Sequence, residues 1–310
     1  MSVALAVLAF LVFPGGLFVI VGSLAYEFVD RKLVARFQNR LGPRWFQPLA
    51  DLIKLLVKEE IVPTGVNRGL FIGLPIAALA ASLTAALYVP MAGLAPSWGF
   101  RGDLVVTVYL LMMMTLCIGL AGANTTDRFS VIGSTRALTQ LFSYEAPFLL
   151  ALLGPAIAAG TWRIAEVNGY AREHVWMIVT QPIGFVVALV GLMGKLELPP
   201  FDAPEAETEI VSGALTEYSG RGLAYFRLGR DIELLVGLTL ISAFYLGGLA
   251  NPLHFFLKTI SLLFVTAGLQ SLFARLRIDQ TVGLWWRIGA VLGLVQLLIL
   301  IVLKVLGARL

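Results

Sequence analysis

Long apolar segments dominate this sequence and restrict what it can fold into. A helix that crosses a lipid bilayer needs about 20 consecutive, mostly apolar residues. Segments of about this length recur along the chain, with polar segments between them. We count eight, at residues 3–26, 70–92, 103–124, 138–160, 175–194, 232–250, 254–273 and 285–306. The sequence therefore predicts an all-α fold: a polytopic membrane protein with about eight transmembrane helices, forming a single membrane domain over residues 1–310.

The composition supports this class and argues against others. Only 14% of the residues are charged, whereas a soluble domain carries about 25%. The single cysteine, Cys117, lies in an apolar segment, and the two histidines, His174 and His254, are far apart in the sequence. These residues provide no disulfide framework and no zinc or iron–sulfur motif. We therefore expect this chain to bind no metal or cofactor itself, and any redox chemistry to belong to other chains.

Basic residues predict the orientation in the membrane. Of the 23 Lys and Arg residues, 17 lie in the alternate loops that follow the first, third, fifth and seventh apolar segments or, for Arg287, at the start of the segment after the last of these loops. Loops rich in Lys and Arg face the cytoplasm. We therefore expect cytoplasmic loops at 27–69, 125–137, 195–231 and 274–284, both termini outside, and a location in the cell membrane. The positive net charge is explained by orientation and gives no reason to expect nucleic-acid binding.

The first of these loops contains a short amphipathic segment, PLADLIKLLVKEE, at 48–60. Its apolar residues follow the i, i+3, i+4, i+7 spacing of one helix face. They are Leu49, Leu52, Ile53 and Leu56, and the other face holds Asp51, Lys54 and Lys58. Because the segment is too short to span a bilayer, we expect a helix that lies in the membrane interface. Such a helix serves as a surface anchor or, alternatively, as the floor beneath a docked partner or a lipophilic substrate.

A cluster of acidic residues separates the fifth and sixth apolar segments. The stretch from Lys195 to Glu233 holds 8 of the 19 acidic residues of the chain. They are Glu197, Asp202, Glu205, Glu207, Glu209, Glu217, Asp231 and Glu233. Carboxylates beside a bilayer are costly, and they are typical of proton or ion pathways.

Helix capping is an alternative explanation for part of this cluster. In the segment DAPE at 202–205, the aspartate suits a helix N-cap and the glutamate completes a capping-box pattern. Capping does not explain Glu209, which would stack on Glu205 as a like charge at i, i+4, nor Glu207 between them. Neighbouring carboxylates raise one another's pKa and share protons. The cluster therefore predicts a proton-entry site, with the arginines that follow it as countercharges.

One further acid, Glu145, falls near the start of the fourth apolar segment and is followed by Pro147. It is either an interfacial residue that reaches water or an ionisable group within the membrane, and the second kind is usually functional. Pro147 removes a backbone hydrogen bond from the helix, which favours a hydrated pocket near Glu145. From the residues alone both interpretations stay open.

Three segments resemble a known family. PPFDAPEAETEIVSGALTEYSG resembles the signature loop of the H subunit (subunit 1) of respiratory complex I, the membrane subunit that joins its two arms. RFQNRLGPRWFQPLADLIKLLVKEEIVP resembles the other signature of that family, and RFSVIGSTRALTQLFSYEAP resembles a third stretch. The three occur in order and cover the predicted cytoplasmic side of the whole chain.

Two departures favour one branch of this superfamily. Only three residues separate Gly42-Pro43 from Gln47-Pro48, where complex I members carry several more, and Leu198 stands where they have arginine. The chain is more similar to the matching subunit of energy-converting, membrane-bound nickel–iron hydrogenases and related ferredoxin-linked complexes.

The resemblance implies a membrane-anchoring and coupling subunit with no catalytic centre of its own. A hydrogenase-like large subunit and an iron–sulfur small subunit would dock on its cytoplasmic loops and hold the nickel–iron centre and iron–sulfur clusters. Antiporter-like and small membrane subunits would contact it in the bilayer, and electron transfer would drive proton or sodium translocation. The alternative is the quinone-chamber subunit of an NADH-, ferredoxin- or deazaflavin-dependent quinone oxidoreductase.

The resemblance also assigns residues. The proton- or ion-coupling positions are Glu145, Asp202, Glu205, Glu207, Glu209 and Glu217. The positions that dock the peripheral arm or form a cavity floor are Arg36, Arg40, Trp45, Phe46, Asp51, Lys54, Phe201 and Arg221. Two other hypotheses differ in kind. A secondary transporter often shows internal repeats, and the two halves of this chain show no similarity. A purely structural anchor would use the acids only to dock a basic partner surface.

Overall fold

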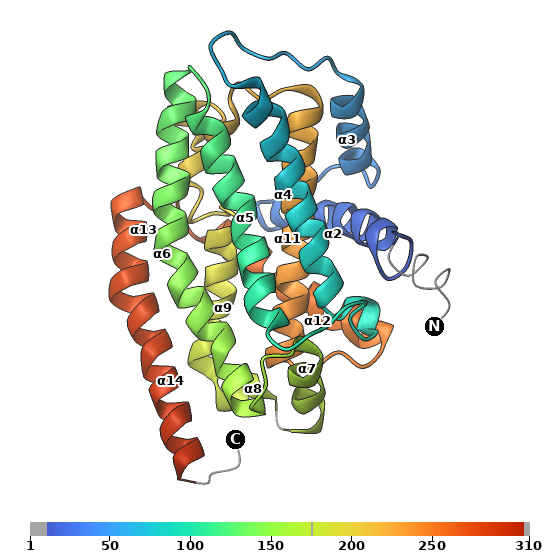
Figure 1. Cartoon of the computed structure of the whole chain (residues 1–310), viewed down its shortest axis with the longest axis vertical. Coiled ribbons are helices and arrows are strands. Elements are labelled where there is room, and N and C mark those ends of the chain that lie inside the picture. Colours follow the sequence, from blue (N-terminus) through green and yellow to red (C-terminus); the bar gives the residue numbers. More distant parts are fainter. Residues whose placement is uncertain (1–10, 175, 307–310) are drawn as a thin grey trace.

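The computed structural model describes residues 11–174 and 176–306. Within these ranges the chain is helical and contains no β-strand (Figure 1). Five helical segments are long and apolar enough to cross a membrane. They are Arg68–Gly93, Asp103–Ala123, Arg128–Ala159, Pro252–Leu272 and Ile278–Val305. The predicted all-α membrane class is confirmed, while the count of eight spans stays a prediction.

The helices fall into two length classes. The long ones are α2 (Gly16–Phe37), α4 (Arg68–Tyr88), α5 (Asp103–Ala123), α6 (Arg128–Ala159), α9 (Pro182–Lys195), α11 (Gly220–Tyr245), α12 (Pro252–Leu272) and α14 (Ala290–Val305). The short ones are α3 (Gln47–Val57), α7 (Ile164–Glu173), α8 (Met177–Thr180), α10 (Glu207–Ile210) and α13 (Ile278–Leu284). Single turns are η1 (Met91–Gly93), η2 (Ala203–Glu205) and η3 (Gly213–Leu215), and the π-helical turn η4 (Trp285–Gly289) joins α13 to α14.

Three helices extend beyond the apolar segments that predicted them. α2 continues to Phe37, α6 begins at Arg128 and α11 begins at Gly220, so each includes residues expected in loops. α6 has 32 residues and is therefore about 48 Å long, whereas the bilayer core is about 30 Å thick. Hydropathy indicates where a helix enters lipid, and backbone hydrogen bonding continues past that point.

The first and fifth predicted segments differ from expectation in other ways. Residues 3–10 of the segment 3–26 lie outside the described residues. The segment 175–194 is interrupted, because α8 ends at Thr180 and α9 begins at Pro182. Proline suits the first turn of a new helix and cannot continue the hydrogen bonding of the previous one. α9 is left with 14 residues.

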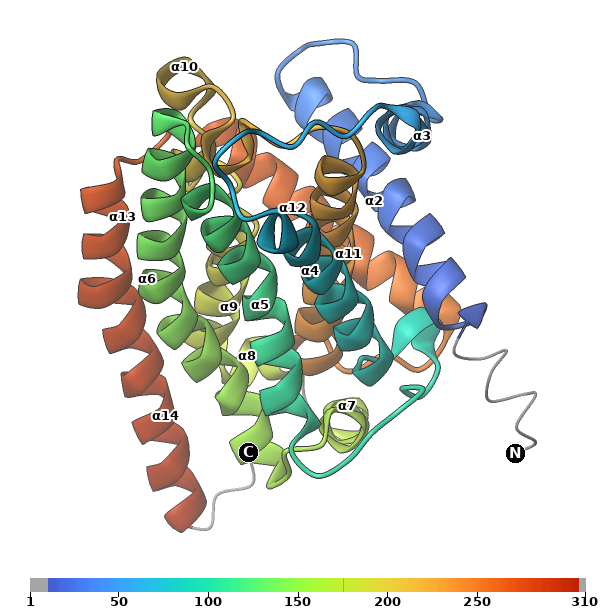
Figure 2. The same ribbon diagram turned by 45° about the horizontal axis from the view of Figure 1, so that its top comes forward.

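α11 lies at the centre of the bundle. Every residue from Ile232 to Tyr245 is buried, which is typical of a helix surrounded on all sides by others. α2, α4 and α9 pack against it, and α12 packs against both α11 and α2 (Figure 2). The core therefore surrounds the helix whose first turns carry Arg227, Arg230 and Asp231.

The acidic segment between α9 and α11 folds into the short turns η2, α10 and η3. Gly133 of α6 allows η3 to approach closely, since a Cβ there would lie 2.4 Å from the backbone nitrogen of Ala214. Gly213, at the start of η3, has a φ of 53°, a left-handed conformation that glycine adopts without strain. This segment covers one end of the bundle, beside α6 (Figure 2).

Two details of the capping hypothesis are wrong. Asp202 precedes η2 but makes no side-chain capping bond, and its carboxylate instead binds Arg275. Glu205 and Glu209 do not stack along one helix, because the chain turns between η2 and α10. Glu205 binds Arg230 of α11, and Glu209 turns away toward α6. Ion pairs with residues distant in the sequence, rather than local helix capping, determine these side-chain positions.

Candidate functional site

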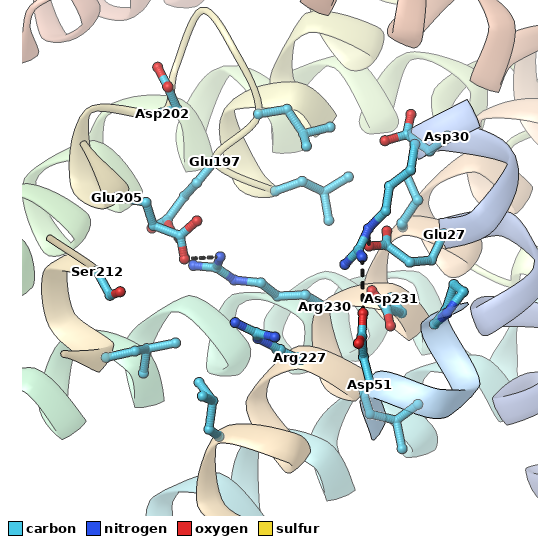
Figure 3. Close-up of a pocket in the computed structure, with 18 of the residues that line it drawn as sticks. Glu27, Asp30, Asp51, Glu197, Asp202, Glu205, Ser212, Arg227, Arg230 and Asp231 are labelled. Carbon is cyan, nitrogen blue, oxygen red and sulfur yellow. Dashed lines mark hydrogen bonds and ion pairs between the residues drawn. The ribbon is translucent and has the colours of Figure 1, made fainter. Parts of the chain in front are cut away.

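A cavity of about 630 Å³ lies between α2, α3, the acidic segment and the first turns of α11 (Figure 3). Among the described residues, seven carboxylates and four arginines line it. The acids are Glu27, Asp30, Asp51, Glu197, Asp202, Glu205 and Asp231, and the arginines are Arg31, Arg227, Arg230 and Arg275. Leu24, Leu52 and Leu55 add an apolar wall. The excess of carboxylates makes the cavity attractive to protons and cations.

Arg230 joins two of these acids. Its guanidinium binds both Glu197 and Glu205 (Figure 3). The Glu197 side chain is 2% exposed, whereas that of Glu205 is 38% exposed. Arg230 therefore connects a solvated carboxylate in the cavity to a carboxylate in the interior.

Glu197 is unusual in both backbone and side chain. Its φ is 53°, a left-handed conformation that is uncommon and strained for a residue other than glycine. Burial raises the pKa of its carboxyl from 4.5 to about 7, because the cost of desolvation and the nearby Glu205 charge outweigh the attraction of Arg230. Its Oε1 is buried and has no hydrogen-bond partner among the described residues. A carboxyl of this kind exchanges its proton near neutral pH.

A second ion pair lies between α6 and α9. Nζ of Lys195 donates a hydrogen bond to Oε2 of Glu145 at 2.9 Å, and the two side chains are 0% and 15% exposed. The ammonium also lies over the rings of Tyr144 and Phe148, 5.3 and 5.7 Å from their centroids, which adds cation–π attraction. Glu145 is therefore held against a buried cation rather than in water.

Glu233 of α11 interacts electrostatically with both ion pairs. It is 1% exposed, and its Oε1 has no hydrogen-bond partner among the described residues. It is within electrostatic range of Lys195 and Glu145 of one pair and of Arg230 and Glu197 of the other. We call this set the charged row; its members, in the order in which ion pairs and electrostatic interactions link them, are Glu205, Arg230, Glu197, Glu233, Lys195 and Glu145. The row leads from the cavity into the bundle.

Other ion pairs connect the walls of the cavity. Asp202 receives two hydrogen bonds from Arg275, at 2.7 and 2.9 Å, a bidentate geometry that fixes both side chains. On the opposite wall Arg31 binds Glu27 and lies 3.5 Å from Asp51 of α3. These contacts tie the acidic segment to the connection after α12, and α3 to α2.

The six predicted coupling residues occupy different environments. Asp202 and Glu205 line the cavity, and Glu145 ends the charged row. Glu209 accepts a hydrogen bond from Arg136 at 2.8 Å and is 51% exposed. Oε2 of Glu217 is buried with no hydrogen-bond partner among the described residues. Glu207 begins α10.

The predicted docking residues are mostly at the surface. Arg36, Arg40, Trp45, Phe46, Lys54 and Arg221 are exposed, and Trp45 and Phe46 pack edge to face before α3. Asp51 lines the cavity. Phe201 is the exception, since it is buried with its ring 5.4 Å from that of Trp285. The packing of Phe201 against Trp285 therefore stabilises the start of the acidic segment.

The structure also brings together residues outside the assigned coupling and docking positions, four of which (Glu197, Arg230, Asp231 and Glu233) were predicted only as part of the acidic cluster or as its countercharges. They are Glu27, Asp30, Lys195, Glu197, Arg230, Asp231, Glu233 and Arg275. Lys195 and Glu233 stand at or inside predicted apolar segments, where any charge is a functional signal. Glu27 and Asp30 gave no such signal, because hydropathy did not show that α2 continues past them.

Within residues 11–174 and 176–306, no three His, Cys, Asp or Glu side chains are arranged to hold a metal ion. Long apolar helices, a charged cavity at one end and ionisable side chains inside the bundle together define the class: a polytopic helical membrane protein with a buried path of ionisable groups.

Comparison with known proteins identifies the family. The family model described as NADH dehydrogenase matches residues 6–301. The H subunit numbered 1 of the NADH-quinone oxidoreductase of Geobacter metallireducens is 36% identical over 304 residues, covering 91% of this chain and 92% of that protein. The H subunit of Bacillus cereus is 31% identical, covering 93% and 91%. The chain belongs to the NADH dehydrogenase family, as a counterpart of the H subunit of complex I-like membrane complexes.

A solved structure shares the fold. A chain of the membrane-bound sulfane sulfur reductase, an archaeal respiratory membrane complex, superposes with a TM-score of 0.85 at 22% identity, covering 97% of this chain and 100% of that one. The resemblance inferred from the three sequence segments is therefore confirmed at the level of family and fold.

Proposed function

We propose that this chain anchors the peripheral redox module of a complex I-like, hydrogenase-like respiratory complex and couples its electron transfer to proton or sodium translocation. The observation that carries the proposal is the charged row, which connects Glu205 in the cavity to Glu145 in α6. Asp202 lines the same cavity, and we propose, from the family resemblance, that Glu207, Glu209 and Glu217 of the acidic segment also take part in coupling.

The physical basis of coupling is electrostatic. A unit charge placed about 4 Å from a carboxylate changes its energy by about 4 kcal/mol at an effective dielectric constant of about 20. That energy corresponds to about a 1,000-fold change in a protonation equilibrium. A redox event that changes the charge beside the cavity therefore changes where protons reside along the row, and each member passes the effect to the next.

The surface around the cavity supports docking. Arg36, Arg40, Trp45 and Arg221 are exposed and offer cationic and aromatic contacts to a partner. In α3, Leu52 and Leu55 face the cavity, while Leu49 and Ile53 are exposed. This is the arrangement of an interfacial helix with apolar residues toward lipid. We propose that this end faces the cytoplasm of the cell and that both termini lie outside.

The compact first loop and Leu198 favour the hydrogenase branch. The partners would be a hydrogenase-like large subunit, an iron–sulfur small subunit, and antiporter-like and small membrane subunits. The nickel–iron centre and iron–sulfur clusters would lie in those partners. Metal analysis of the complex that copurifies with this chain tests the branch: stoichiometric nickel supports it, and iron without nickel contradicts a hydrogenase partner.

Quinone binding is the second candidate function. The apolar wall of Leu24, Leu52 and Leu55 in the cavity favours it, as do relatives named as the H subunit of NADH-quinone oxidoreductase. A photoreactive quinone should then label the chain near Trp45, Phe46 or Leu52, and the complex should reduce quinone. Absence of both labelling and quinone reduction contradicts this alternative.

Ion translocation by the complex in liposomes tests the coupling role. We expect Glu145→Gln to leave assembly intact and to reduce the number of ions moved per electron. Glu209→Gln is tested beside it, and Glu166→Gln serves as a control because Glu166 is 53% exposed in α7, which lies at the opposite end of the bundle from α10 (Figure 2). Normal translocation in both Glu145→Gln and Glu209→Gln contradicts a proton path. Reduced assembly with unchanged coupling per assembled complex supports a purely structural anchor instead.

A further inference from the structure

The last apolar span carries an arginine on its outer face. α13 and α14 lie at the edge of the bundle, beside α6 (Figure 1). At the π-helical turn η4 between them, Trp286, Arg287 and Ile288 are exposed, whereas Trp285 before them and Gly289 after them are buried. π-helical turns inside α-helices are frequent at functional sites. Three successive side chains, one of them charged, therefore lie on the outside of the bundle.

Contacts on the inner side fix the orientation of this turn. The ring of Trp285 lies 5.4 Å from that of Phe201. Gly289 approaches its neighbours so closely that a Cβ there would lie 2.7 Å from Cε3 of Trp285 and 3.4 Å from Cβ of Pro147 in α6. Rotating the helix to bring Arg287 toward the core would break these contacts. The outward position of Arg287 is therefore set by the packing of the turn.

Arg287 lies at the depth of a membrane interface. The residues between Arg287 and Lys304 carry no charge. This stretch of helix is about 26 Å long, close to the thickness of about 30 Å of the hydrocarbon core. At its other end, Lys304 donates a hydrogen bond to the carbonyl oxygen of Ile157. The two cations therefore mark the two edges of the core, and Trp286 belongs to a residue type that is enriched at this depth.

Arg287 differs from the neighbouring arginines in its lack of a countercharge. Arg275 binds Asp202, and Arg277 lies 3.4 Å from Asp279. In the part of the chain that the structure describes, no Asp or Glu forms a salt bridge with Arg287. An arginine at an apolar surface is costly unless it is paired, and its planar guanidinium matches the oxygens of a phosphate. The anion that pairs with Arg287 therefore comes from outside this chain.

We propose that Trp286 and Arg287 bind the headgroup phosphate of an anionic phospholipid, whose acyl chains lie along the exposed face of α14. That face is apolar over several turns and is formed by Val291, Leu294, Val295, Leu298, Ile301, Val302 and Val305. An arginine close to the edge of the core reaches the headgroup layer by extending its apolar stem along the helix. A lipid therefore satisfies both the charge and the apolar face.

The leaflet follows from the connection before α13. The backbone N–H of Leu276 donates a hydrogen bond to the carbonyl oxygen of Pro200, so α13 begins at the end of the bundle that holds the acidic segment. This is the end proposed to face the cytoplasm, and the cytoplasmic leaflet is the one rich in anionic lipids. Only this choice of leaflet rests on the proposed orientation.

Native mass spectrometry of the complex that copurifies with this chain tests the site, with phosphatidylglycerol as the anionic probe and phosphatidylcholine as the zwitterionic one. We expect phosphatidylglycerol to stay bound where phosphatidylcholine dissociates. Arg287→Gln should weaken its binding roughly five-fold, the contribution of one arginine near an anionic lipid surface. Arg277→Gln is the matched control, because Arg277 directly precedes α13 and is 80% exposed. Equal binding in wild type and Arg287→Gln, or an equal loss in the control, overturns the inference.

A phosphatidylglycerol with a photoreactive group in its acyl chain tests the position of the lipid without any variant. We expect labelling of α14 between Ile288 and Leu298, suppressed by excess phosphatidylglycerol and not by phosphatidylcholine. Labelling that is spread evenly over the apolar helices, or that both lipids suppress equally, contradicts a specific site.

A partner helix that carries a carboxylate is the competing explanation for Arg287. In that case Arg287→Gln releases another membrane subunit from the complex, α14 is not labelled, and the lipid site is refuted. Arg287→Lys keeps the charge and should retain both phosphatidylglycerol binding and assembly. Since none of these measurements depends on ion translocation, the lipid site and the coupling function are tested separately.

Discussion

Replacing Arg230 with methionine tests how the buried end of the cavity maintains its charges. Methionine keeps most of the side-chain length and removes the cation that binds Glu197 and Glu205. Glu205 is 38% exposed, so water replaces its partner at a cost of about 0–1 kcal/mol. For the buried Glu197, loss of the partner of an ionised side chain costs about 3–5 kcal/mol.

Protonation limits that larger cost. Burial has already raised the pKa of Glu197 to about 7 in the presence of Arg230. At or below pH 7 the variant therefore binds a proton at Glu197 with little further loss of stability. Above pH 7 the loss grows by about 1.4 kcal/mol per pH unit, until it reaches the full cost of the broken pair. We expect about 1 kcal/mol at pH 6 and about 3 kcal/mol at pH 9.

Reversible unfolding in mixed micelles at these two pH values measures the difference. Arg277→Met is the control. Among the salt bridges of the described residues, Arg277 pairs only with Asp279, and the two side chains are 80% and 66% exposed. The control substitution should change stability by less than about 0.5 kcal/mol. Adding Glu197→Gln to Arg230→Met should remove the pH-dependent part of the loss of stability. A loss of 3 kcal/mol or more already at about pH 6 would show that Glu197 stays ionised, and it would refute the reasoning.

Three further predictions concern stability. The pKa of Glu197 is raised from 4.5 to about 7. The contribution of this carboxyl to the free energy of unfolding is therefore fully present below pH 4.5 and is lost as the pH rises through about 7. Glu197→Gln should make the free energy of unfolding less dependent on pH over this window. Gly133→Ala should cost about 1–3 kcal/mol by pushing η3 away, whereas Gly73→Ala, with nothing within 4 Å, should cost nothing. Phe201→Ala should cost about 3–5 kcal/mol in thermal unfolding by opening a cavity against Trp285; no measurable loss in either costly variant contradicts the packing described above.

The acidic segment illustrates where reasoning from sequence succeeds and where it stops. Its carboxylates were recognisable as functional because charge beside apolar helices is costly. The arginines that follow were predicted as countercharges, and Arg230 is one of the partners, but the individual pairings were not predictable, since Arg230 is 25 residues from Glu205 and Arg275 is 73 residues from Asp202. Local rules of helix capping apply only to neighbours along the chain, and here they gave a wrong account of Asp202.

The extension of α2 past its apolar segment also could not be predicted from the sequence. Hydropathy predicted a loop from residue 27, whereas helix geometry continues to Phe37 and brings Glu27 and Asp30 to the cavity wall. Polar residues form stable helices when they pack in a bundle, and a hydropathy average over a sliding window does not detect such helices.

The sequence by itself determined the class, the family and the approximate membrane segments, because these depend on apolar length and on contiguous motifs. It also located the acidic segment and Glu145. Only the tertiary structure decided that Lys195, Glu197 and Glu233 form one row with them. A buried charge is defined by its distance to another charge and by its burial, and both quantities arise only when α6, α9 and α11 pack together.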